Sequence, residues 1–279
     1  MIIYTCITNG YDEIPDQYYD PDVQYVCFTD GTVEKKGPWE FRDILIEYDC
    51  PRRRSAHPKM NPHLYFPMGA KTTWIDGCYV MTEKFVERSK ENLENNNFTI
   101  MRHADRFSYM DEILEGFMGS MNTWDDQILI TKTIKDLGYN FKKYISPVLG
   151  SIWRVVTEDL IEFDELWWKY SLIGPNRDQI SFDTARQLTN MKMHVLEHGW
   201  LAKKGYRQPG SMGVLFGTSG KAGRRKLHPK AGHPKQYLER DKMTAEIKKI
   251  TGLHPHLYAR HNHMPFVYRN VIEPYLPES

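Results

Sequence analysis

The sequence has little cysteine, and its cysteines are not paired along the chain. Only 4 of the 279 residues are Cys, they lie 21 or more residues apart, and no Cys-x-x-Cys pair occurs. This spacing indicates neither a zinc knuckle nor a disulfide framework. We therefore expect free thiols in a reducing compartment, by default the cytoplasm. The four residues are Cys6, Cys27, Cys50 and Cys78.

Long apolar runs are also missing. No stretch approaches the roughly 18 consecutive apolar residues that a membrane-spanning helix needs. No basic region precedes the short apolar stretch at residues 1–8, as it would in a signal peptide. We expect a soluble protein without a membrane partner, in which residues 1–8 form the first strand.

Three common catalytic signatures are absent. The chain contains no G-x-x-x-x-G-K-[ST] loop, no G-x-G-x-x-G at the start of a helix and no G-x-S-x-G elbow. These absences argue against a P-loop enzyme, a dinucleotide-binding oxidoreductase and a hydrolase with a nucleophile elbow.

What is present is enough apolar material for a large core. Hydrophobic residues make up 41% of the chain and aromatic residues 13%, which excludes a disordered, collagen-like or coiled-coil protein. The formal net charge is only +1, but it is unevenly distributed: residues 202–260 hold 14 basic and 3 acidic residues, and the rest hold 23 and 33. We predict an acidic domain over residues 1–200 and a basic, loop-rich extension with an aromatic tail over residues 201–279.

The extension has two possible roles. Residues 207–235 contain seven basic residues, six glycines and no acid, a composition typical of a mobile loop. Its cations could contact a nucleic-acid backbone, with interleaved aromatic residues stacking on bases. Alternatively, the loop could close over an anionic sugar nucleotide. The candidate residues for either role are Lys221, Arg224, Arg225, Lys226, Lys230 and Lys235.

Strand-like and helix-like segments alternate through the first 200 residues. This alternation predicts an α/β fold with a mostly parallel sheet flanked by helices. In such sheets ligands bind beyond the carboxyl ends of the strands, so polar residues there are the first candidates for a site. Strands are predicted at residues 1–8, 23–29, 41–48, 71–77, 98–101 and 151–156, and helices at 82–94, 110–117, 124–137 and 178–188.

Three segments could carry chemistry. Asp76 follows a predicted strand and precedes Gly77, Asp178 begins a predicted helix, and residues 52–63 place four cations within eight positions. Structural alternatives exist for each: a turn acid that caps the next helix, an acid stabilised by the helix dipole, and a solvated charge run. Together the segments favour group transfer from a phosphorylated donor, with cations on a leaving diphosphate and acids for a metal or a nucleophile.

Several short strings of residues resemble a known family. They occur in an order typical of the glycosyltransferase-like family that includes plant turgor-regulation and seed-mucilage-related proteins, with bacterial and viral relatives. The resemblance covers residues 1–200 and leaves out the extension. The strings are Tyr4-Thr5, Phe28-Thr29-Asp30, Lys59-x-Asn61-Pro62-His63-x-x-Phe66-Pro67, Trp74-Ile75-Asp76-Gly77, His103-x-x-Arg106, Arg154, Trp167-Trp168 and Arg177-Asp178-Gln179-x-Ser181-Phe182.

The resemblance implies a GT-A-like fold, a UDP-linked or similar sugar donor and a divalent metal, Mn²⁺ or Mg²⁺. Asp76 would bind the metal, although Cys78 stands where the family tends to Asn, and hard ions prefer oxygen. His198 is the candidate for a second metal ligand, and Asp178 for the residue facing the acceptor hydroxyl, as base or hydrogen-bond acceptor. The candidate donor-binding residues are Thr5, Asp30, Arg53, Lys59, Asn61, His63 and Gln179.

Two hypotheses remain open from the sequence. One is a glycosyltransferase, hexosyl or pentosyl, whose acceptor is a glycan or a hydroxymethylated base in viral DNA. It would act in the cytoplasm of a bacterial or virus-infected cell. The other is a catalytically inactive α/β protein that binds nucleic acid through the basic extension.

Overall fold

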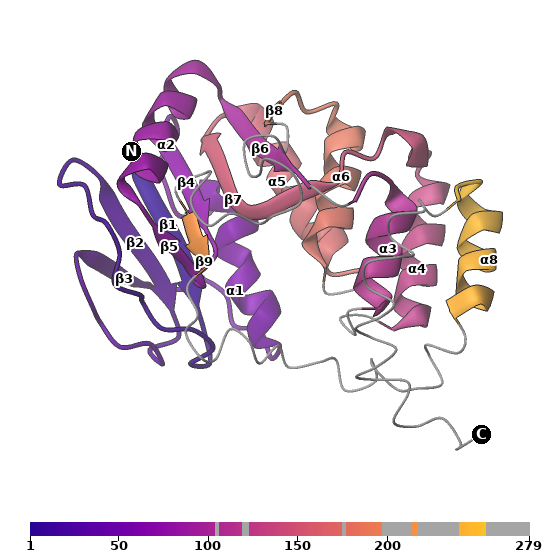
Figure 1. Ribbon diagram of the computed structural model, residues 1–279, viewed down its shortest axis with the longest axis horizontal. Helices are drawn as coiled ribbons and strands as arrows, with labels where there is room; N and C mark the ends of the chain where they lie inside the picture. The colour runs from indigo at the N-terminus through magenta and orange to yellow at the C-terminus, as the bar shows by residue number, and fades with distance from the viewer. Residues whose placement is uncertain (104–105, 119–122, 175–176, 197–213, 217–239, 255–279) are drawn as a thin grey trace. The chain divides into compact units, whose positions relative to one another are not determined.

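The computed structural model describes residues 1–103, 106–118, 123–174, 177–196, 214–216 and 240–254. They divide into two compact units (Figure 1). The first comprises the described residues of 1–102, 148–168 and 191–225, and the second those of 103–147, 169–190 and 226–279. Within the described residues, no helix is both long and apolar enough to cross a membrane.

A seven-stranded sheet forms the centre of the first unit, in the order β3-β2-β1-β4-β7-β6-β8 (Figure 1). Strands β3, β2, β1 and β4 run parallel, β7 is antiparallel to β4, and β6 is parallel to β8. The predicted α/β class with a mostly parallel sheet is therefore confirmed. The strands are β1 (Ile2–Ile7), β2 (Gln24–Thr29), β3 (Trp39–Asp43), β4 (Lys71–Ile75), β6 (Phe98–Arg102), β7 (Pro147–Val155) and β8 (His194–Leu196).

Side chains of the central strand β1 alternate between two apolar layers, as expected for a strand buried on both faces. Ile3 and Ile7 belong to a core that includes Phe85 of α2 (Glu83–Asn95). Tyr4 points to the other face, where its ring lies 5.0 Å from that of Phe66, after α1 (Pro51–Met60) and the short helix η1 (Pro62–Leu64). Phe98 of β6 packs on the same side against Phe163 of α5 (Glu158–Ser171), with ring centroids 5.3 Å apart.

Helices make up the described secondary structure of the second unit. α3 (Tyr109–Met118), α4 (Trp124–Asp136) and α8 (Arg240–Thr251) lie side by side (Figure 1), together with α6 (Asp178–Thr189) and η2 (Phe141–Lys143). Their shared core includes Ile113 and Ile130, and α8 adds Met243 and Ile247, both fully buried.

The boundary predicted at residue 200 stays a prediction, because only residues 214–216 and 240–254 of the proposed extension are described. Val214–Phe216 forms β9, which pairs antiparallel with β5 (Tyr79–Met81) in the first unit. Helix α8 completes the apolar core of the second unit. The described segments 214–216 and 240–254 therefore belong to different units, because each short apolar segment has its partners earlier in the chain.

A buried ion pair joins β7 to the helices on one face of the sheet. Arg154 is fully buried in β7, and its Nη1 donates to Oδ1 of the fully buried Asp164 of α5 at 3.1 Å. Its Nη2 donates to the Tyr4 hydroxyl at 2.6 Å and to the Lys59 carbonyl at 2.5 Å. One guanidinium group thus holds β1, α1 and α5 together.

Replacing Arg154 by Ala is expected to destabilise the protein by about 3–5 kcal/mol, because Asp164 would be left buried without its guanidinium partner. Urea unfolding monitored by circular dichroism measures the loss. Lys36→Ala is the matched control, since it removes a surface ion pair with Asp16, and should cost less than about 1 kcal/mol. Equal losses in both variants would contradict the role assigned to Arg154.

Candidate functional site

The candidate site lies at the carboxyl ends of β1 and β4. The chain passes from β1 to β2 and β3 on one side of β1, and then through α1 to β4 on the other side. The order of strands therefore reverses between β1 and β4, which is where open α/β sheets bind ligands. Asp76 directly follows β4 at this point.

Gly77 allows the ends of these two strands to approach closely. A side chain on Gly77 would place its Cβ 2.9 Å from Cγ1 of Ile7 and 3.5 Å from Oδ2 of Asp12. The glycine therefore serves the close packing of the β4 end against the β1 end. The same contact brings a second carboxylate, that of the buried Asp12, to the neighbourhood of Asp76.

The Asp76 carboxylate is held by an indole and an ammonium group. Nε1 of Trp74 donates to Oδ1 of Asp76 at 2.8 Å, and Nζ of Lys59 lies 3.6 Å from the same oxygen. That Nζ also lies 5.6 Å from the centroid of the Trp74 ring. The Lys59 side chain is only 8% exposed, whereas that of Asp76 is 38% exposed. The result is a fixed cation beside a carboxylate that solvent can reach.

The position of Lys59 depends on the buried network of the fold. It lies in the last turn of α1, which contains Pro58 in its interior, and its carbonyl accepts the hydrogen bond from Arg154. Since Asp164 holds Arg154, the backbone from which the Lys59 side chain extends is fixed on two sides. The structure thus brings together Lys59 and Asp76, which the sequence had proposed separately.

The first turn of α1 is unusually positive. It contains Arg52, Arg53 and Arg54 and no acid, and the helix begins at Cys50 without a side-chain cap. Because a helix N-terminus itself carries partial positive charge, arginines are unfavourable there unless an anion is near. Oγ1 of Thr8 donates to the Pro51 carbonyl at 3.1 Å, which ties this helix start to the end of β1. Arg54 pairs with Glu47 at 3.0 Å; binding of a donor by Arg53 stays a prediction.

Asp30 and Thr5 have structural contacts in this fold. Oδ2 of Asp30 accepts the Asn9 amide at 2.8 Å, and Oδ1 accepts the Thr32 amide at 3.2 Å. Burial opposes ionisation of Asp30, but the Thr32 hydroxyl and these amides hold its pKa below the usual value. Thr5 is 2% exposed within β1 and shares its face with Ile3 and Ile7; a contact of Thr5 with a donor stays a prediction.

Asn61 is buried as well, and the side chain of His63 is only 7% exposed. Nδ2 of Asn61 donates to the His57 carbonyl at 3.2 Å and so closes the end of α1. Nδ1 of His63 lies 3.3 Å from Oδ2 of Asp164. Burial and the nearby His63 lower the pKa of His57 to about 4, so His57 adds no positive charge at pH 7. Of the donor-binding residues predicted in residues 52–63, Lys59 is the one whose side chain contacts Asp76 at the end of β4; donor binding by Asn61 and His63 stays a prediction.

The residues described around Asp76 do not fit a divalent metal. Within the described part of the chain, no group of three His, Cys, Asp or Glu side chains is close enough to hold an ion. A dication bound about 2.1 Å from Asp76 Oδ1 would lie within about 6 Å of the Lys59 ammonium, a repulsion on the order of 6 kcal/mol at an effective dielectric constant of 20. His198, the predicted second ligand, lies outside the described residues, as do Lys221, Arg224, Arg225, Lys226, Lys230 and Lys235.

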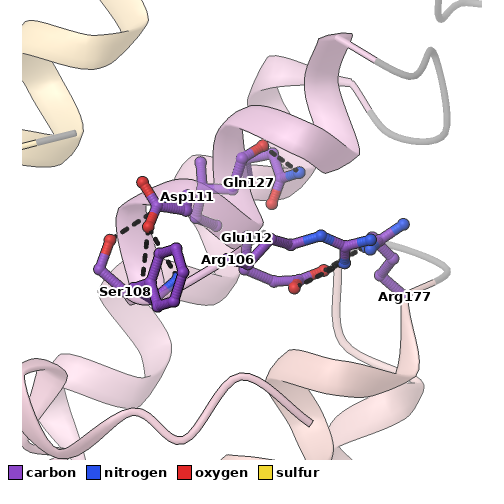
Figure 2. Close-up of polar contacts among 8 residues, drawn as sticks. Arg106, Ser108, Asp111, Glu112, Gln127 and Arg177 are labelled. Atoms are coloured by element: carbon purple, nitrogen blue, oxygen red, sulfur yellow. Dashed lines mark hydrogen bonds and ion pairs between the residues drawn. The ribbon is translucent and has the colours of Figure 1, made fainter. Parts of the chain in front are cut away.

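The second unit contains a buried carboxylate between two arginines. Figure 2 shows Glu112 of α3 facing Arg106 and Arg177. Nη1 of Arg106 donates to Oε2 of Glu112 at 2.8 Å, and Nε of Arg177 donates to Oε1 at 2.5 Å. Burial alone would raise the pKa of Glu112, but the guanidinium groups of Arg177 and Arg106 outweigh it and lower this pKa to about 2. Glu112 is therefore ionised at neutral pH.

Glu112 links two of the strings singled out in the sequence. Arg106 ends the His103-x-x-Arg106 string, and Arg177 immediately precedes Asp178 at the start of α6. The ion pairs thus fix the backbone from which Asp178 and Gln179 extend. Both of these residues belong to the second unit, so a role for them beside Asp76 stays a prediction.

Sequence reasoning missed Glu112, Asp164 and Asp12. The sequence flanking Glu112 or Asp164 does not distinguish these acids from surface acids of other helices. They differ in their burial and in their arginine partners, which only the structure shows. The arginines in the quoted strings could have pointed to these acids, because a buried arginine needs an acidic partner.

No family model and no curated protein matches the chain. Among solved structures, apo mouse xyloside xylosyltransferase 1 is similar over 79% of this chain and 97% of its own, with 10% sequence identity and a TM-score of 0.43. The galactosyltransferase LgtC, in complex with donor and acceptor sugar analogues, is similar over 96% of this chain and 100% of its own, with 9% identity and a TM-score of 0.46. At this level of similarity neither a family nor a reaction follows, and the function has to be inferred from the site residues.

Replacing Glu112 by Gln is expected to change how stability depends on pH. Because its pKa is 4.5 in a model peptide and about 2 in the fold, the stabilisation is fully present above pH 4.5 and is lost as the pH falls through 2. The difference corresponds to about 3 kcal/mol. Urea unfolding between pH 2 and 7 should therefore show a gap between wild type and variant that closes toward low pH.

Glu94→Gln is the matched control, since Glu94 is exposed in α2. Its stability curve should run parallel to that of the wild type. A gap between wild type and the Glu112 variant that stays constant from pH 7 to pH 2 would show that the ion pairs do not stabilise the fold.

Proposed function

We propose that this chain is a glycosyltransferase that moves a sugar from a nucleotide-sugar donor to an acceptor hydroxyl. The observation that carries the proposal is the pairing of the nearly buried Lys59 ammonium with the solvent-accessible Asp76 at the point where the strand order reverses. A fixed cation at that edge suits the phosphates of a nucleotide, and an accessible carboxylate suits the hydroxyls of a sugar.

The electrostatics of the first unit support a phosphorylated ligand. Three arginines share the first turn of α1, where the helix dipole adds to their charge. Thr8 connects that turn to the end of β1, next to the β4 end that carries Asp76. A positive helix start of this kind favours an anion with more than one charged oxygen, such as a diphosphate.

The proposed reaction breaks one bond and forms one. The bond between the sugar C1 and the oxygen of the donor diphosphate breaks, and its electron pair leaves with the nucleoside diphosphate. A bond forms between C1 and the acceptor oxygen, whose proton passes to a base. Asp178, at the start of α6, is our candidate for that base, and Gln179 for a contact with the donor.

The finer assignments rest on the family resemblance of the quoted strings. They are a GT-A-like fold, membership in the family of plant turgor-regulation and mucilage-related proteins with bacterial and viral relatives, and a UDP-linked hexose or pentose donor. The acceptor would be a glycan or a hydroxymethylated DNA base, and the site of action the cytoplasm, where the free cysteines would stay reduced. The divalent metal expected at Asp76 is not carried into this proposal, because Lys59 already neutralises the carboxylate.

A second candidate function is nucleic-acid binding by the basic residues near the C-terminus, with or without catalysis. The net charge of +11 over residues 202–260 favours it, because cations that displace counterions from a phosphate backbone supply most nonspecific affinity.

Replacing the six cations Lys221, Arg224, Arg225, Lys226, Lys230 and Lys235 by Gln should weaken retention of double-stranded DNA at low salt. It should also make the dependence of affinity on salt concentration shallower, since fewer counterions are released. Filter binding between 20 and 200 mM NaCl measures both effects. Release of nucleoside diphosphate from the donor, measured in parallel, should stay at the wild-type rate if these cations dock the acceptor. No DNA retention by the wild type would eliminate the second function.

Asp76→Asn is expected to reduce sugar transfer and donor hydrolysis by at least about 100-fold, because the carboxylate charge beside the reacting sugar is lost. A panel of nucleotide sugars, assayed for released nucleoside diphosphate, measures this. The control is Asp22→Asn, an exposed acid just before β2, at the opposite edge of the sheet from Asp76. Full turnover in the Asp76 variant, or no turnover of any donor by the wild type, would contradict the proposal.

A further inference from the structure

We infer that the ammonium group of Lys59, and not a divalent ion held by Asp76, binds the donor diphosphate at the carboxyl end of β4 and stabilises its negative charge. This inference rests on the proposed transferase function and specifies the charge on which its site relies.

The first reason is the place that Lys59 already occupies. Its Nζ lies 3.6 Å from Oδ1 of Asp76 and over the ring of Trp74. A metal ion exchanges with solvent, whereas this ammonium is tethered to a backbone that Arg154 fixes through the Lys59 carbonyl. The site therefore carries a permanent cation next to the carboxylate on which a metal would depend.

The second reason is the chemistry of the remaining ligands. Oδ1 of Asp76 already accepts a hydrogen bond from the Trp74 indole. Cys78, two residues further on, would offer a soft sulfur, while Mg²⁺ and Mn²⁺ prefer several oxygens. Asp12 is the other acid that approaches this strand end, and it is buried. Among the described residues, the side chains of Asp76, Cys78 and Asp12 therefore suit one ammonium group better than a hard divalent cation.

The third reason is that Lys59 can serve both partners at once. An ammonium group has three N–H donors that can point in different directions. At 3.6 Å, Nζ is attracted to Asp76 but lies beyond normal hydrogen-bond length. Turning one N–H toward a phosphate oxygen therefore keeps the attraction to Asp76. When the bond from the sugar C1 to the diphosphate oxygen breaks, this oxygen gains charge that the ammonium stabilises, and the proton stays on Nζ.

Isothermal titration with UDP, GDP, ADP and inorganic pyrophosphate tests the inference. Each probe is titrated into the full-length protein in 1 mM EDTA and again in 5 mM MgCl₂. We expect the probe that binds most tightly to have the same Kd in both buffers, within about twofold. In EDTA, Lys59→Met should weaken its binding at least about tenfold, and Lys59→Arg, which keeps the charge, should weaken it less. The control is Lys71→Met, which changes an exposed lysine at the start of β4 and should leave the Kd unchanged.

The outcomes separate this inference from the proposed function. Binding that requires Mg²⁺ and disappears in EDTA would overturn the role of Lys59 while leaving the transferase in place. Unchanged binding by a folded Lys59→Met variant, with the fold checked by thermal unfolding without ligand, would overturn it as well. If no probe binds in either buffer, the proposed function and this inference both fail.

Discussion

The candidate site depends on one buried ion pair. Arg154 and Asp164 are both fully buried, and neither could stay charged there without the other, because moving an unpaired charge out of water costs far more than a folded protein can spare. Once paired, the arginine has donors left for the Tyr4 hydroxyl and the Lys59 carbonyl. Arg154, which is neutralised by Asp164 in the core, thereby fixes the position of the last turn of α1. It also fixes the backbone of Lys59, whose ammonium group faces Asp76.

The second unit uses the same physical solution in a different arrangement. There one buried carboxylate, Glu112, satisfies two arginines, and the two guanidinium groups lower its pKa to about 2. In both units the buried acid lies within a helix and its arginine partners lie on strand or loop segments, and one of these arginines, Arg177, immediately precedes the candidate residue Asp178. Buried charge of this kind adds little net stability compared with apolar packing, but it tolerates only one arrangement of its partners. That property suits segments that must hold a reactive side chain in place.

Two helices that the sequence patterns failed to predict, α1 and α8, share a cause. Helix α1 has three arginines and two prolines in ten residues, and among the α8 side chains whose burial is described the buried ones are Met243 and Ile247. Neither has the broad apolar face that marks a helix in isolation. α1 becomes helical because Pro51 suits the first helical position and its last turn is buried against the sheet. α8 becomes helical because its short stripe completes a core formed by α3 and α4. Conversely, residues 44–48 have strand-like composition but follow the end of β3.

The sequence by itself determined the class of the fold and the location of the strand end that carries Asp76. Alternating strand and helix patterns are local properties, and they suffice to predict a parallel sheet and the edge at which its polar residues gather. Only the tertiary structure decided which of those polar residues lie beside solvent and which are paired with buried partners in the interior. Lys59 and His63 lie four positions apart in the same segment. Lys59 pairs with the accessible carboxylate of Asp76, whereas His63 pairs with the buried carboxylate of Asp164. That difference arises from partners more than ten residues away along the chain, Asp76 and Asp164, and a one-dimensional pattern does not encode which distant side chain comes near.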